Sequence, residues 1–122
     1  MARRVFLLTG VLSALLVVTG TAGCGTSTST DQQVIGVSMA HFDDNFLTMI
    51  RTAMADYPKT LPGVALQFTD AQGDVARQLS QVQNLVAQDA AAIIVNAADT
   101  SATPSMTKAA RDAGVPLVYV NR

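Results

Sequence analysis

Residues 74–95 read DVARQLSQVQNLVAQDAAAIIV, and they decide the fold because a helical pattern passes directly into a strand pattern. Apolar residues recur at helical spacing and form one apolar face: Val75, Leu79, Val82, Leu85 and Val86. The polar residues between them are expected mostly to face outward: Arg77, Gln78, Gln81, Gln83 and Asn84. Asp74 is a suitable N-cap, so the helix is predicted to begin after Gly73. The apolar run that ends this stretch, residues 91–95, predicts a buried strand.

The same alternation extends along the chain in both directions. Strands are predicted at residues 34–39, 64–68, 91–95 and 116–120. Further helices are predicted at residues 45–57 and 103–113. This order favours an α/β fold with a parallel, doubly wound sheet of four strands and three helices. All strand runs except the second are nearly continuously apolar, which indicates strands that helices cover on both faces.

The first 23 residues have the pattern of a secretory signal peptide. Arg3 and Arg4 form a short basic start, and residues 5–18 are an apolar run shorter than the roughly 20 residues of a membrane span. The two arginines also fit a partial twin-arginine signal, but the general secretory route is the main expectation. Residues 24–33 are polar and of low complexity, so we expect a flexible tether, with residues 34–122 as the folded part.

Cys24 is the only cysteine and therefore has no partner for a disulfide within the chain. The small residues at 21–23 that lead into it resemble the lipobox of bacterial lipoproteins. We therefore expect Cys24 to become the N-terminal residue and to carry a lipid anchor, which tethers the protein on the extracytoplasmic side of the cell envelope. The alternative is an incidental small residue beside an ordinary cleavage site.

Composition argues against several classes of function. The chain has 8 Lys and Arg against 9 Asp and Glu, without a basic patch, so nucleic acid is not an expected partner. One His and one Cys, far apart, leave no transition-metal site. The first predicted strand leads into Ser38 and Met39 rather than a glycine-rich phosphate loop, so no nucleotide cofactor and no enzyme activity are expected.

In open parallel sheets, ligands bind beyond the carboxyl ends of the strands, where the strand order reverses. This rule selects residues 40–46, 69–73, 96–101 and 121–122. Motifs within and around these segments are Ile35-Gly36-Val37, Phe42-Asp43-Asp44-Asn45-Phe46, Asp70-Ala71-Gln72-Gly73-Asp74, Ile94-Val95-Asn96-Ala97-Ala98-Asp99, Gly114-Val115-Pro116 and Val120-Asn121-Arg122.

Together these motifs resemble the sugar-binding family of periplasmic substrate-binding proteins, which serve ATP-binding-cassette importers, and they look most like its glucose/galactose-binding branch. The resemblance implies that the protein captures a monosaccharide (a hexose, a pentose or a related polyol) and docks on a membrane permease. It also implies an N-terminal fragment with an incomplete first lobe, because a second lobe is expected to complete the cleft. Such a fragment is expected to bind sugar weakly or not at all.

Asp44 and Phe46 are the first site residues that the resemblance implies. A carboxylate accepts strong hydrogen bonds from vicinal hydroxyls, and an aromatic ring stacks on the apolar face of a sugar. The alternatives are an N-cap role for Asp44 and a core position for Phe46. Asn45 is expected to shape the turn, with ligand contact as a second role.

Asn121 and Arg122 are the other implied contacts. Their amide and guanidinium groups suit ring and hydroxyl oxygens. The resembled branches tend towards Asn-Lys or Asp-Arg here, so the Asn-Arg mixture leaves the sugar's identity open. Asn96 and Asp99 are expected to fix the loop after the third strand through side-chain-to-backbone bonds, and His41 is expected to be exposed.

Other functions remain as alternatives to transport. A sensor or signal-molecule binder of the same fold differs in its partner rather than its architecture. A truncated remnant that binds nothing is a further alternative. A transcription factor with this fold carries a DNA-binding domain where this chain has a signal and a cysteine.

Overall fold

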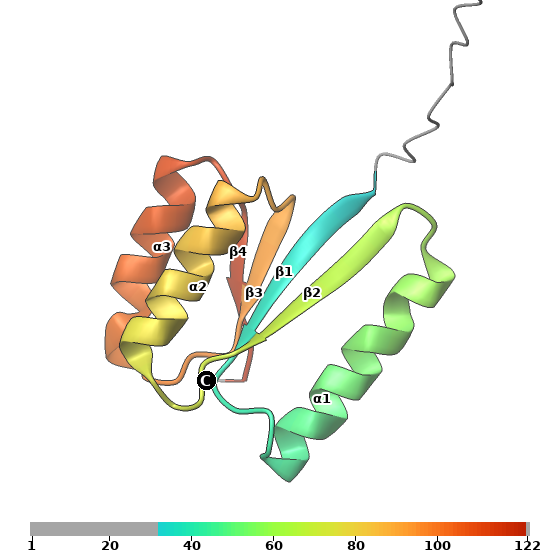
Figure 1. Ribbon diagram of the computed structural model, residues 1–122, viewed down its shortest axis with the longest axis horizontal. Helices are drawn as coiled ribbons and strands as arrows, with labels where there is room; N and C mark the ends of the chain where they lie inside the picture. Colours follow the sequence, from blue (N-terminus) through green and yellow to red (C-terminus); the bar gives the residue numbers. More distant parts are fainter. Residues whose placement is uncertain (1–31, 122) are drawn as a thin grey trace, which may run out of the picture.

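The computed structural model describes residues 32–121 (Figure 1). Its elements are β1 (Gln33–Met39), α1 (Asn45–Asp56), η1 (Tyr57–Thr60), β2 (Val64–Asp70), α2 (Val75–Ala87), β3 (Ala92–Val95), η2 (Thr100–Ala102), α3 (Thr103–Asp112) and β4 (Leu117–Tyr119). The predicted order of strands and helices is confirmed, and the predicted ends differ from these by two residues at most. The signal peptide, Cys24 and Arg122 lie outside the described residues.

The four strands form one parallel sheet in the order β2-β1-β3-β4. Val37 of β1 lies opposite Phe68 of β2 on one side and Ile94 of β3 on the other. The chain passes from β1 through α1 to β2 on one side of β1, and then from β2 through α2 to β3 on the other side. The order therefore reverses between β1 and β3, and the loops that follow these two strands diverge at this point.

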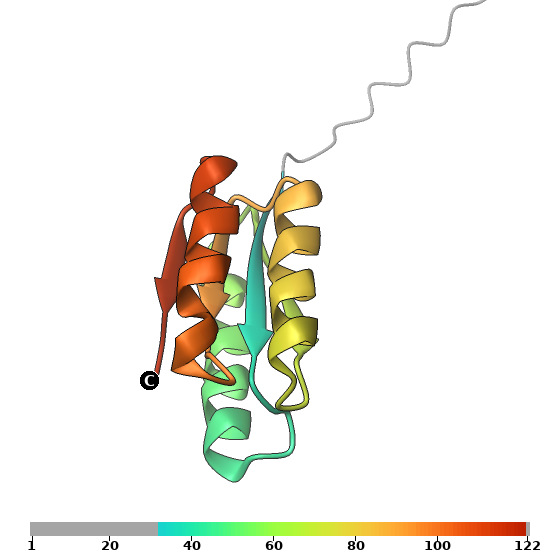
Figure 2. The same cartoon turned by 90° about the vertical axis from the view of Figure 1, so that its left-hand side faces the viewer.

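Helices α2 and α3 cover one face of the sheet, and α1 lies on the opposite face (Figures 1 and 2). The first core joins Val82 and Leu85 of α2 and Met106 of α3 to Ile93 and Val95 of β3. All five side chains are almost completely buried. The apolar stripe predicted for α2 is thus the face that packs on the sheet, although Val75 at its start is 37% exposed.

The second core lies under α1, where Leu47 packs with Val37 and Met39 of β1. This helix, with η1 directly after it, covers β1 and β2, and within residues 32–121 no other α-helix lies on this face of the sheet. Val118 of β4 points to this side and is 58% exposed. The expectation that helices cover the fourth strand on both faces is therefore wrong for the described residues. Among residues 32–121, none of the helices is both long and apolar enough to span a bilayer.

Candidate functional site

The loops that follow the strands meet at the carboxyl edge of the sheet. Gly73 N–H in the loop after β2 donates to the Ala40 carbonyl in the loop after β1, at 2.8 Å. Val120 N–H, directly after β4, donates to the Val95 carbonyl at the end of β3, at 2.9 Å. The parallel topology thus brings the described residues of the four predicted segments to one edge, as the position rule for parallel sheets requires.

Asp44 caps α1. Its Oδ1 accepts a hydrogen bond from Leu47 N–H at 2.8 Å, and its own carbonyl accepts the first helical bond from Thr48 N–H. The capping alternative is therefore present in the structure. The side chain is exposed, and within residues 32–121 its second oxygen has no hydrogen-bond partner. Contact with a ligand through this second oxygen stays a prediction, because one carboxylate can serve both roles.

Phe46 lies in the first turn of α1 and is 56% exposed, whereas its neighbour Leu47 is 6% exposed and belongs to the core. The alternative of a core position for Phe46 is therefore wrong. Asn45 is the first residue of α1 and is also exposed. The sequence places Phe46 off the apolar stripe of the helix, and this displacement leaves its ring open to solvent or to a ligand.

Asn121 is exposed and has a left-handed backbone with φ of 55°. Asn adopts this conformation more readily than most residues. Asn121 lies at the edge that also carries the loops after β1 and β3, because its carbonyl and Ala40 N–H both bond to the Asn96 side chain. Arg122, the other predicted contact at this end, lies outside the described residues.

His41 lies over Gly73, where an added Cβ would come within 2.8 Å of the imidazole ring. Gly73 also has φ of 72°, so two constraints favour glycine there. The His41 side chain is 46% exposed and lies 3.9 Å from the Asp43 carboxylate. An open hollow of about 580 Å³ lies here, lined by His41, Phe42, Asp43, Asp70 and Gln72. The predicted contacts Asp44, Phe46 and Asn121 do not line it.

Two side chains of α1 hold the loop before it, and the sequence reading did not identify either. Thr48 Oγ1 donates to the Phe42 carbonyl at 2.9 Å. The Arg51 guanidinium lies over the Phe42 ring, 4.1 Å from its centre. Such a cation–π contact stabilises by about 0.5–1 kcal/mol at an exposed site. Helical spacing alone offers only a weak signal for these contacts, because Phe42 precedes the helix.

Gln78 departs from its prediction. The sequence pattern predicts that it faces outward with the other polar residues of α2, but it is fully buried. Its amide bonds to the loop after β3, accepting from Ala98 N–H and donating to the Asn96 carbonyl. Asn96 and Asp99 fix this loop through side-chain bonds to backbone, as predicted, since Asp99 accepts from Ser101 N–H at 2.7 Å. The spacing of apolar residues cannot predict that Gln78 is buried, because its side chain is polar.

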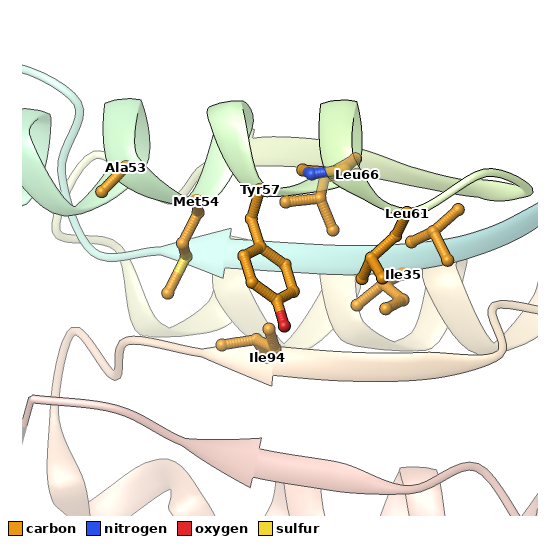
Figure 3. Close-up of a pocket in the computed structure, with 9 residues that line it drawn as sticks. Ile35, Ala53, Met54, Tyr57, Leu61, Leu66 and Ile94 are labelled. Carbon is orange, nitrogen blue, oxygen red and sulfur yellow. The ribbon is translucent and has the colours of Figure 1, made fainter.

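An apolar groove of about 430 Å³ lies towards the other end of the sheet, between α1 and the strands (Figure 3). Its lining is Ile35, Ala53, Met54, Tyr57, Pro58, Leu61, Val64, Leu66 and Ile94. Apart from the Tyr57 hydroxyl, these side chains offer no polar group that recognises a hydroxylated ligand. The carboxyl edge is therefore the better candidate site. Over residues 32–121, no three His, Cys, Asp or Glu side chains are grouped so as to hold a metal ion.

Sequence comparison matches the chain to a family model and to several curated relatives. A model of the periplasmic binding protein domain matches residues 35–122. The chain is 52% identical over 113 residues to the putative rhizopine-binding protein of Rhizobium meliloti, covering 93% of this chain and 34% of the relative. It is 28% identical over 114 residues to the D-galactose/methyl-galactoside binding periplasmic protein MglB of Haemophilus influenzae, with the same coverage of 93% and 34%. The chain spans about a third of the length of these relatives.

Structural comparison agrees with the sequence match. The crystal structure of an ABC transporter solute binding protein from Bacillus halodurans, with bound myo-inositol, superposes with a TM-score of 0.72. The two sequences are 36% identical, and the match covers 79% of this chain and 33% of that chain.

Proposed function

Because this chain belongs to the periplasmic binding protein domain family, we propose that the protein binds a small polyhydroxylated ligand for an ATP-binding-cassette importer. The ligand is a monosaccharide or a related polyol such as myo-inositol. The chain supplies one side of the binding site at the carboxyl edge of its sheet. The proposal has no catalytic step, since capture and delivery of the ligand need none.

The observation that carries the proposal is the exposure of both Asp44 and Phe46 at the start of α1, in a chain 36% identical to a protein crystallised with myo-inositol. A carboxylate accepts from vicinal hydroxyls through charge-assisted hydrogen bonds. An exposed ring covers the C–H face of the ligand. Asn121 adds an amide that both donates and accepts. Arg122 is proposed as a further donor, and Asn45 as a contact at the start of the helix.

Calorimetric titration of the protein isolated from its native host tests this function. The panel holds myo-inositol, D-galactose, D-ribose and xylitol, with L-leucine as a ligand without hydroxyl groups. We expect saturable binding of at least one polyol and none of leucine. Binding of leucine, or failure of every polyol, contradicts the proposal. We expect the 122-residue chain, titrated in parallel, to bind more weakly, because it has about a third of the length of its relatives.

We also propose that the protein is exported and anchored through a lipid on Cys24, with residues 1–23 removed. The basic start, the apolar run and the single cysteine support this. Intact-mass measurement of the membrane fraction is expected to show a chain that begins at Cys24 and carries a lipid increment. The Cys24→Ser variant serves as the control and is expected to leave the membrane fraction. An unmodified Cys24 in the membrane-bound wild type contradicts the anchor.

A further inference from the structure

Two buried amides connect the loops at the carboxyl edge. Asn96 is 1% exposed and Gln78 is fully buried. The Asn96 side chain accepts from Ala40 N–H through Oδ1 at 3.3 Å, in the loop after β1. Its Nδ2 donates to the carbonyls of Val120 and Asn121 at 3.3 and 3.4 Å, directly after β4. One side chain directly after β3 therefore bonds to the segments that follow the two neighbouring strands, β1 and β4.

Gln78 of α2 holds Asn96 in turn. Its Nε2 donates to the Asn96 carbonyl at 2.9 Å, and its Oε1 accepts from Ala98 N–H at 2.8 Å. We call Asn96, Gln78 and the backbone groups that they bond the amide frame. Every buried side-chain nitrogen and oxygen among residues 32–121 has a hydrogen-bond partner, and those of the frame are included. A fully bonded buried network makes its geometry specific, because any displacement leaves a buried polar group unpaired.

The frame connects the two sides of the candidate site. Ala40 begins the loop that leads to Asp44 and Phe46, and Asn121 lies at the other end of the frame. The exposed Asn121 has a left-handed backbone, and its carbonyl accepts from Asn96. Without the amide donor of Asn96, the segment after β4 keeps the Val120 N–H bond to the Val95 carbonyl and the backbone preference of Asn121.

We propose that Asn96, held by Gln78, is a positioning residue that sets the placement of Asn121 relative to the Asp44 loop and thereby the affinity for the polyol ligand. This inference rests on the proposed function. Asn96 itself is buried and does not touch the ligand. It acts by aligning residues that do.

Asn96→Asp in the complete gene product isolates this role. The variant keeps the acceptor for Ala40 N–H and nearly the same shape, but it loses the donor to Val120 and Asn121. We expect affinity for the polyol selected by calorimetry to fall about 3- to 10-fold, the effect of a lost hydrogen bond. In an Asn121→Ala background the same change is expected to have little further effect, because the positioned side chain is already absent.

Gln81→Glu is the matched control. Gln81 is also on α2; it accepts from Ser38 Oγ and donates from Nε2 to the Asp70 carbonyl, so this variant also exchanges an amide donor for a carboxylate. Its bonds reach the ends of β1 and β2 but not Asn121. Its effect on affinity is expected to be the same with and without Asn121→Ala. Asn96→Asp behaving like this control overturns the inference.

Two further outcomes are decided by the same experiment. Where Asn96→Asp does not fold, Gln78→Glu replaces it; this variant keeps the acceptor for Ala98 N–H, loses the bond to Asn96, and is expected to couple to Asn121→Ala. Additive effects overturn the inference while the proposed function stands. A wild-type protein that binds no polyol overturns the proposed function, and the inference fails with it.

Discussion

Asp44 caps a helix with one carboxylate oxygen and has the other available for a ligand, so its two roles can be separated by substitution. Asp44→Ser keeps a side-chain oxygen that caps nearly as well. We expect its free energy of unfolding to stay close to the wild type. Polyol affinity is expected to fall about 10- to 100-fold, because a hydrogen bond to a charged group contributes roughly 1.5–3 kcal/mol. Thermal unfolding and calorimetry measure the two effects.

Asp74 provides the control for Asp44, because its Oδ1 caps α2 through Arg77 N–H at the same 2.8 Å. Both Asp44→Ala and Asp74→Ala are expected to lose about 1 kcal/mol of stability. Only the first is expected to weaken ligand binding. Wild-type affinity in Asp44→Ser would show that this residue is a cap and nothing more.

Substitution of Phe46 is a second way to test ligand binding without a large effect on protein stability. Because its ring is 56% exposed, Phe46→Ala is expected to change the free energy of unfolding by no more than about 0.5 kcal/mol. Loss of a stacked ring is expected to lower polyol affinity about tenfold, since stacking and burial together exceed 1 kcal/mol. Tyr57 is 65% exposed and lines the apolar groove. Tyr57→Ala should therefore leave affinity unchanged, and equal losses in both variants would contradict the assignment.

Strand β1 and helix α2 pack closely at Gly36, because glycine has no side chain to separate them. A Cβ at this position would lie 2.6–2.9 Å from three side-chain carbons of Leu85. Overpacking costs about 1–3 kcal/mol, which outweighs the gain of about 0.4–1 kcal/mol from a stiffer unfolded chain. Gly36→Ala is therefore expected to lower the midpoint of urea unfolding. In a Leu85→Ala background the loss should disappear; the same loss in both backgrounds would place its cause elsewhere.

The helices and strands can be predicted from local sequence, because apolar residues in each element recur with the spacing of that element. The stripe of α2 and the apolar run of β3 are examples, since burial there follows sequence spacing. The burial of Gln78 does not follow from such spacing. Its burial depends on partners 18 and 20 residues away, Asn96 and Ala98. Spacing along one helix contains no information about carbonyl and amide groups that the sheet places beside it.

In the candidate site, too, some features follow from local sequence and others only from the folded sheet. Topology and local chemistry were enough to place Asp44 and Asn121 at the carboxyl edge and to predict the cap on α1. The exposure of Phe46 follows from its displacement from the apolar stripe. The bonds from Asn96 to Ala40 and Asn121 cross 56 and 25 residues of sequence, and only the assembled sheet reveals them.

Across the molecule, the candidate site and the apolar groove lie towards opposite ends of the sheet. The carboxyl edge carries the exposed polar loops and the buried amide frame. The apolar groove lies towards the amino end, and the exposed Val118 lies on the face that α1 leaves open. The chain spans about a third of the length of its curated relatives. This separation predicts that ligand contact and apolar contact use different parts of the surface.

The most direct test of ligand binding at the carboxyl edge is a map of backbone amide chemical-shift changes during titration with the polyol that calorimetry selects. We predict that the largest changes fall in residues 40–46, 96–99 and 121. Smaller changes are expected along β1 and β3, and almost none in η1. Changes concentrated at residues 57–64, around the apolar groove, would contradict the account and assign the ligand to the other end of the sheet.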